Sequence, residues 1–148
     1  MSRSFDGIDD KISLGTTTLN EFPYPTSFSF SFWINFISLT SGRIITKWGD
    51  IGSEQHSLVY KRDSLDAEIG FAAHQGGIYL VKYTTDANLL AGTWYHFAVV
   101  YAGGNNVTIY KNAISEALTT SSNGTPSLGL NSTDLAIGYE SASPVVPV

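Results

Sequence analysis

The stretch from residue 27 to residue 36 constrains the fold of this chain more than any other feature. It reads Ser-Phe-Ser-Phe-Ser-Phe-Trp-Ile-Asn-Phe, so large apolar side chains recur at every second position. A period of two is typical of a β-strand, because successive side chains point to opposite faces. Burial of each Phe or Ile contributes about 1.5–3 kcal/mol. The stretch therefore predicts a strand over about residues 27–38, with its Phe and Ile face buried between two sheets.

Other segments show the same alternation, separated by short runs rich in Gly, Asn, Asp and Pro that are typical of turns. Residues 4–14 predict two short strands around a turn at 6–10, whereas the Ser/Thr/Asn/Gly-rich residues 119–133 predict a loop. No helical periodicity occurs, and about ten short strands are typical of an all-β, antiparallel two-sheet β-sandwich. The further strands that we expect are 43–48, 56–62, 67–73, 78–84, 94–101, 107–110, 114–118 and 135–139.

Length and charge narrow the classes of function. The chain has 148 residues, of which 43% are hydrophobic, so it can form one folded domain. Its net charge is −5 and it has no basic patch, which argues against nucleic acid and anionic membrane surfaces as partners. No apolar run approaches the ~18 residues that span a bilayer. Residues 1–15 lack the apolar segment of a signal peptide. If Met1 is the start, we expect export by another route, such as assembly into a phage particle; if the chain is part of a larger protein, this expectation does not apply.

Three segments follow one another in an order that is typical of one family. They are residues 5–12, residues 28–35, and the strand Trp94-Tyr95-His96-Phe97-Ala98 with the hairpin Tyr110-Lys111-Asn112-Ala113 after it. Together they resemble the laminin-G-like jelly-roll domains of the concanavalin A-like lectin/glucanase group. The resemblance covers residues 4–139 and implies a jelly-roll fold, with residues 1–148 as a single domain. Ala113 departs from the family pattern, because a Gly is usual there and turns often need a positive φ.

The last eight residues also depart from that family. Its members usually continue with a final strand that pairs near the first, whereas this chain ends Ser-Ala-Ser-Pro-Val-Val-Pro-Val. The two prolines restrict residues 141–148 to a sheet edge or to a path outside the sheet. Because an open edge invites pairing with another chain, we expect that this domain can form a homo-oligomer.

Catalysis is not expected. Glucanases of the group resemble one another in a Glu-x-Asp-x-Glu strand, whose paired carboxylates suit retaining glycoside hydrolysis. The nearest match is residues 64–68, but Ser64 replaces the first Glu. The chain also lacks cysteine and the sequence patterns of serine hydrolases, zinc proteases and P-loop enzymes. We therefore predict a protein that is not an enzyme.

Glycan binding usually combines an aromatic platform with polar side chains that reach the sugar hydroxyls. Trp48 ends a strand beside a polar loop, and Tyr79 and Tyr83 share one strand face. With His74 they are the predicted carbohydrate-binding residues. For Trp33 and Trp94 we favour a structural role under a covering loop. His96 matches the strand histidine of the family that the chain resembles, and we favour for it a hydrogen-bonded position within the sheet.

The resemblance also implies calcium, because lectin-like sandwiches often hold this ion in their loops. Calcium takes oxygen ligands from carboxylates and turn carbonyls. The candidates are Asp6, Asp9 and Asp10 in the first hairpin, with Asp50 and Glu54 in the loop after Trp48. Capping of the turn by the side chains of Asp6 and Asp9 is the alternative that we favour.

These observations lead to one principal hypothesis and two alternatives. The principal hypothesis is a non-enzymatic carbohydrate-binding domain of a phage tail or bacterial surface protein, located on a virion or outside the cell, with a glycan or polysaccharide as its partner. The first alternative is a structural or oligomerisation domain of a virion or surface fibre. The second, a hydrolase, rests on fold analogy alone, which is weak support for a function.

Overall fold

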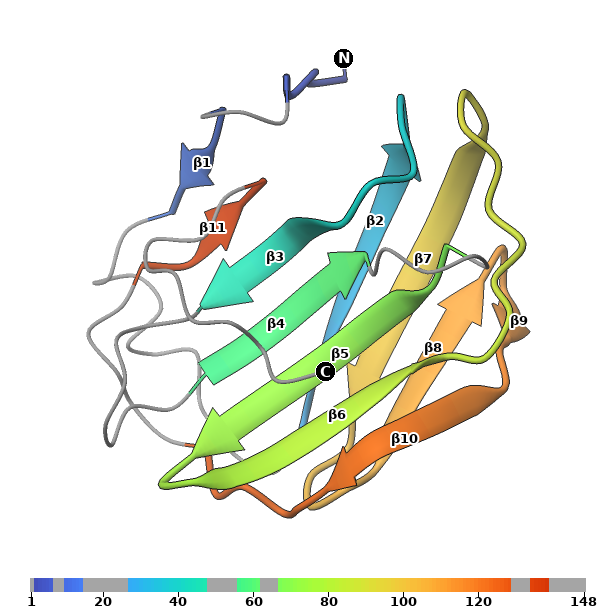
Figure 1. The fold of residues 1–148 in the computed structure, drawn as a ribbon. Coiled ribbons are helices and arrows are strands. Elements are labelled where there is room, and N and C mark those ends of the chain that lie inside the picture. Colours follow the sequence, from blue (N-terminus) through green and yellow to red (C-terminus); the bar gives the residue numbers. More distant parts are fainter. Residues whose placement is uncertain are drawn as a thin grey trace.

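A computed structural model describes residues 2–6, 10–14, 27–47, 56–61, 67–128 and 134–138. Within these ranges the chain forms strands and connecting turns, and no helix there is long and apolar enough to cross a membrane. Figure 1 shows the strands of the described residues stacked in two layers. They are β1 (Ile12–Ser13), β2 (Phe28–Asn35), β3 (Gly42–Lys47), β4 (His56–Lys61), β5 (Ile69–Gln75), β6 (Ile78–Thr84), β7 (Trp94–Tyr101), β8 (Val107–Lys111), β9 (Ile114–Ser115), β10 (Leu118–Asn123) and β11 (Ala136–Ile137).

The two layers are antiparallel sheets of unequal size. The larger has the strand order β1-β11-β3-β4-β5-β6-β10, and the smaller has the order β2-β7-β8-β9. In Figure 1 the smaller sheet lies behind the larger one. The expected all-β class and the antiparallel two-sheet sandwich are therefore confirmed.

The core lies between the sheets and follows the alternation of the strands that face it. In β7 the buried side chains are Tyr95, Phe97, Val99 and Tyr101, and β5 contributes Phe71 from the other sheet. The Phe28 ring of β2 connects the layers, because its centroid lies 6.0 Å from that of Phe71 and 5.2 Å from that of Tyr101.

The strand β2 has the face that its alternation predicts, but this face is less buried than expected. Phe28, Phe30, Phe32 and Ile34 are only partly buried while they pack against the core. The reason is the position of β2 at the end of the four-stranded sheet, where it has a hydrogen-bonded neighbour only in β7 among the described strands. The side chains of such an edge strand are covered by a neighbouring strand on one side only, so part of their surface stays exposed.

The prediction of a loop over residues 119–133 is wrong for its first part. Strand β10 pairs with β6 in the register Leu118↔Thr84 and Thr119↔Tyr83, and it ends the larger sheet. Polar contacts support this pairing: Ser122 Oγ donates to the Tyr79 carbonyl oxygen at 2.7 Å. A polar strand suits an edge of a sheet because it needs no apolar face there.

The two-strand prediction for residues 4–14 is also partly wrong. Residues 4–6 form no strand, and β1 pairs instead with β11 in the register Ile12↔Ile137. Strand β11 in turn pairs with β3, so residues that are distant in sequence meet at one end of the larger sheet. Gly138 fits there because its φ is +87° and a Cβ would lie 2.6 Å from Cδ1 of Phe5.

Candidate functional site

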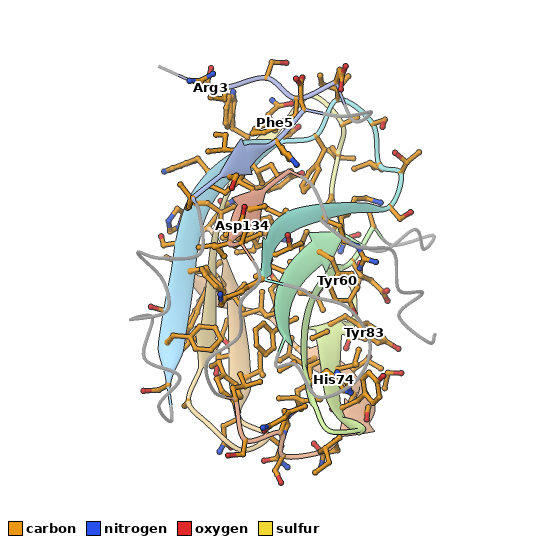
Figure 2. The ribbon with its side chains drawn as sticks, turned by 90° about the vertical axis from the view of Figure 1, so that its left-hand side faces the viewer. Arg3, Phe5, Tyr60, His74, Tyr83 and Asp134 are labelled. Carbon is orange, nitrogen blue, oxygen red and sulfur yellow. The ribbon has the colours of Figure 1, made fainter. Side chains whose placement is uncertain are left out.

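The larger sheet gathers aromatic side chains on the face that points away from the core. In β6, Leu80 lies in the core, whereas Tyr79, Val81 and Tyr83 belong to a separate cluster on the opposite face. Tyr60 of β4 joins this second cluster. In Figure 2, Tyr60, Tyr83 and His74 lie along the same side of the molecule. We call the surface formed by Tyr60, His74, Tyr79 and Tyr83 the tyrosine face.

Register places two of these tyrosines on either side of a glycine. Gly70 of β5 pairs with Tyr60 of β4 and with Tyr83 of β6. A Cβ on Gly70 would lie only 2.3 Å from Cζ of Tyr60, so the Tyr60 ring occupies the space above this residue. A larger residue at position 70 would displace a ring of the tyrosine face.

The other end of the tyrosine face is a stacked pair of rings. His74 and Tyr79 are cross-strand partners, and their centroids are 4.0 Å apart with an interplanar angle of 22°. The Gly77 N–H donates to His74 Nε2 at 3.2 Å, so the neutral ring carries its proton on Nδ1. Desolvation by burial lowers the pKa of His74, which favours that neutral form.

The centre of the tyrosine face is small and apolar. Ala72 and Val81 pair across β5 and β6 and are buried, between the Tyr60–Tyr83 row and the His74–Tyr79 row. Tyr79 and Tyr83 keep part of their surface exposed, whereas Tyr60 is buried. The arrangement combines flat aromatic rings with phenol hydroxyls, which can donate and accept hydrogen bonds.

The structure brings together three of the four residues that we predict to bind carbohydrate, namely His74, Tyr79 and Tyr83. Trp48 lies outside the described residues. Sequence reasoning missed Tyr60. The alternation of β4 places it opposite the core residue Val59, but only the strand register shows that it lies beside Gly70 and Tyr83.

The calcium candidates are not gathered by the described part of the chain. The Asp6 N–H donates to Asp10 Oδ2 at 3.0 Å, a contact that closes a turn. Asp9, Asp50 and Glu54 lie outside the described residues. Among the residues that the structure describes, no group of three His, Cys, Asp or Glu side chains could hold a metal ion. Calcium binding stays a prediction.

The smaller sheet corrects one interpretation and confirms another. The expectation that a loop covers Trp33 and Trp94 is wrong, because these side chains are 67% and 52% exposed. His96 is hydrogen-bonded within the sheet as expected: its Nε2 lies 2.9 Å from Ser31 Oγ, and its main-chain N–H donates to Asn112 Oδ1.

Comparison with known proteins agrees with this architecture. Residues 6–146 match a laminin-G family model described as the concanavalin A-like lectin/glucanases superfamily. The matched range includes every described strand of both sheets. No curated protein matches the chain.

Proposed function

The chain belongs to the concanavalin A-like lectin/glucanases superfamily, and we propose that it is a non-enzymatic domain that binds carbohydrate on its tyrosine face. The observation that carries this proposal is the convergence of Tyr79, Tyr83 and His74 on one sheet face. The C–H face of a sugar ring can lie against a tyrosine ring, while its hydroxyls exchange hydrogen bonds with the phenol.

The sheet holds these groups in place before any ligand arrives. Tyr79 and Tyr83 lie on β6, a strand of the larger sheet that is paired on both sides, with β5 on one side and the edge strand β10 on the other. The stack with His74 orients Tyr79 further. A ligand therefore loses little free energy to the ordering of protein side chains, which favours binding.

The proposal of a non-enzymatic domain rests on the carboxylates. Ser64 occupies the first position of the nearest match to the glucanase pattern, and Glu68, at its last position, is buried. A buried carboxylate is poorly placed to reach a glycosidic bond, and one missing partner removes the acid–nucleophile pair that the reaction needs.

The proposed partner is a glycan or polysaccharide outside the cell, and the proposed setting is a virion or bacterial surface. Homo-oligomer formation through residues 141–148 remains a prediction, because these residues lie outside the described ranges. Calcium is the proposed cofactor. The experiment includes a chelator, because glycan binding that persists without calcium would show that the domain does not need it.

The test is a broad glycan array probed with the wild-type domain, first with calcium and then with chelator. The glycan with the highest signal is then titrated by calorimetry against Tyr79→Ala, Tyr83→Ala and Tyr83→Phe. We expect the alanine variants to bind the glycan about tenfold more weakly than wild type, or weaker still. The affinity of Tyr83→Phe should lie between that of the alanine variants and that of wild type.

Ile78→Ala is the matched control, because Ile78 is the exposed neighbour of Tyr79 on the same strand and alternation turns it to the other side. Its affinity should equal that of wild type. An array that stays blank in both conditions would overturn the proposed function.

A further inference from the structure

The smaller sheet carries an open hollow on its outer surface. Trp33 of β2 and Trp94 of β7 border it, with His96, Asn112 and Ala113 completing its lining, and its volume is about 430 Å³. The two tryptophan side chains are 67% and 52% exposed, although indole is among the largest apolar groups in proteins. Alternation explains their direction, because the neighbours Phe32 and Tyr95 pack into the core.

Strand register fixes the rings relative to one another. Trp33 pairs with His96 across β2 and β7, and their ring centroids are 5.3 Å apart at an angle of 51°. Trp94 lies two residues before His96, hence on the same face of β7. The three rings thus lie on one face of the smaller sheet and border the same hollow.

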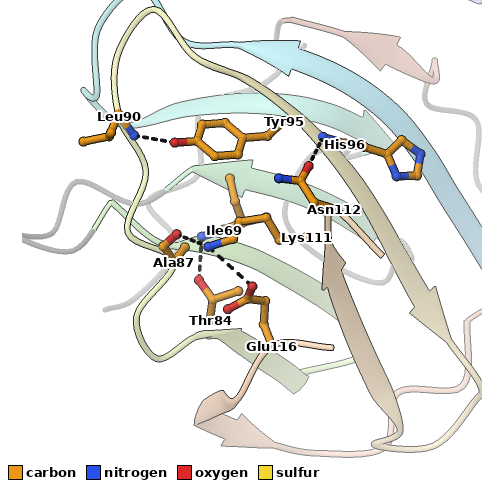
Figure 3. Close-up of polar contacts among 9 residues, drawn as sticks. All are labelled: Ile69, Thr84, Ala87, Leu90, Tyr95, His96, Lys111, Asn112 and Glu116. Carbon is orange, nitrogen blue, oxygen red and sulfur yellow. Dashed lines mark hydrogen bonds and ion pairs between the residues drawn. The ribbon is translucent and has the colours of Figure 1, made fainter. Parts of the chain in front are cut away.

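Hydrogen bonds also fix the polar part of the lining. Asn112 Oδ1 accepts from the His96 N–H at 3.0 Å, and the Asn112 N–H donates to the His96 carbonyl oxygen at 2.8 Å. Figure 3 shows the first of these contacts. The side-chain nitrogen Nδ2 of Asn112, His96 Nδ1 and both indole N–H groups have no hydrogen-bond partner among the described residues, so they remain available to a ligand.

The loop that leads into Trp94 is bonded to β7, to β8 and to the residue that follows β2, all on the side of the smaller sheet. The Leu90 N–H donates to the Tyr95 hydroxyl at 2.9 Å, and Lys111 Nζ reaches the Ala87 carbonyl oxygen and Glu116 (Figure 3). The Gly92 N–H donates to the Phe36 carbonyl oxygen at 2.8 Å. The hollow is therefore bordered by ordered backbone, which lowers the entropic cost of binding.

We propose that this hollow is a second carbohydrate site, and that its ligand is a neutral glycan. Exposed indole faces suit the C–H face of a sugar, and the unpaired N–H groups suit its hydroxyls. Among the described residues no Asp, Glu, Lys or Arg side chain lines the hollow, so it offers no opposite charge that would favour a carboxylate or sulfate group over a hydroxyl. The inference goes beyond the tyrosine face, with which it shares only the class of ligand.

The size of the hollow favours a small ligand over a protein. Its volume falls within the roughly 300–1,000 Å³ that small-molecule sites occupy. A stable protein interface would bury about 800 Å² on each partner. The five residues that line the hollow offer a smaller surface area than this. A second copy of the chain is nevertheless an outcome that the experiment must separate, because Ile114 beside Ala113 is 70% exposed.

The test uses a variant in which the tyrosine face is disabled, Tyr79→Ala/Tyr83→Ala, on an array of neutral and acidic glycans. We expect this variant still to bind at least one neutral glycan. Adding Trp33→Ala or Trp94→Ala should weaken that binding about tenfold or more, whereas Trp33→Tyr should retain most of it. Ile114→Ser is the matched control and should bind like its parent. Circular dichroism verifies that each variant is folded.

Other outcomes of this experiment would attribute glycan binding to the tyrosine face alone, to the hollow alone or to neither surface. Binding that disappears in the tyrosine variant, and that Trp33→Ala or Trp94→Ala leaves unchanged in the wild-type background, would overturn this inference while the proposed function stands. If the tyrosine variant binds every glycan as tightly as wild type does, and this binding depends on both tryptophans, the result would support the hollow and contradict the tyrosine face. Selective binding of acidic glycans, or a dimer that dissociates in Trp33→Ala and Ile114→Ser by light scattering, would overturn the inference. A wild-type array without any signal would overturn both proposals.

Discussion

Asn112 is bound twice to the main chain of His96, once through its side chain and once through its own N–H. The Oδ1–N distance is 3.0 Å, and the N–O distance is 2.8 Å. Asn112 has a φ of +50°, a left-handed conformation that Asn tolerates better than most residues. The residue that turns the chain from β8 to β9 therefore also holds β7 at the border of the hollow.

Replacement of Asn112 by Ala should lower the free energy of unfolding by about 1–2 kcal/mol, because it removes a hydrogen bond and leaves an alanine in the left-handed region. Asn112→Gly should lose less, since Gly adopts a positive φ without strain. Urea denaturation measures both variants. Equal losses in the two variants would contradict a contribution from backbone strain.

Ala113 is a second strained position, with a φ of +67°. Ala113→Gly should stabilise the protein by about 0.5–1 kcal/mol, because relief of the left-handed strain exceeds the entropic cost of glycine. The midpoint of urea unfolding should rise at an unchanged slope. A lower midpoint would show that Ala113 contributes contacts that outweigh its strain.

Gly70→Ala should destabilise the protein by about 1–3 kcal/mol, because the new Cβ would overlap the buried Tyr60 ring. Gly42→Ala is the control: its Cβ would meet nothing within 4 Å, and we expect a change of about 0.5 kcal/mol or less. In a Tyr60→Ala background the cost of Gly70→Ala should disappear. An undiminished cost there would place its origin outside the ring contact.

His74 makes stability depend on pH in a defined direction. Burial lowers its pKa in the folded protein below the 6.5 of an exposed histidine, so the unfolded chain takes up a proton first as the pH falls. Stability from this group is complete above pH 6.5 and decreases from there until the folded-state pKa is reached. His74→Gln, measured by urea unfolding across this range, should reduce the decrease. An identical pH profile of stability in wild type and in His74→Gln would contradict this contribution of His74.

The pattern of residues 27–36 was sufficient to predict a strand and its core face, because alternation is a local property of the sequence. Its partial burial was not predictable, since it depends on the place of β2 at the end of a sheet. Strand β10 was missed because Ser and Thr replace the apolar residues that would reveal it, although β-branched Thr119 and Thr120 favour a strand.

The site shows the same limit. Alternation placed Tyr79 and Tyr83 on one face, but their proximity to Tyr60 follows from strand register, which joins residues distant in sequence. Whether a loop covers Trp33 depends equally on distant segments, and sequence reasoning chose the wrong answer there. Local pattern thus predicts the direction of a side chain, and tertiary structure decides what lies beside it.

The central claim is that this domain binds carbohydrate on its aromatic surfaces, and chemical-shift mapping tests it most directly. The ¹⁵N-labelled domain is titrated with the best glycan from the array. We predict that the shifted amide signals cluster around Tyr79 and Tyr83, with the indole N–H signals of Trp33 and Trp94 shifting if the hollow is also occupied. A spectrum that stays unchanged at saturating glycan, or shifts confined to residues distant from both surfaces, would contradict the claim.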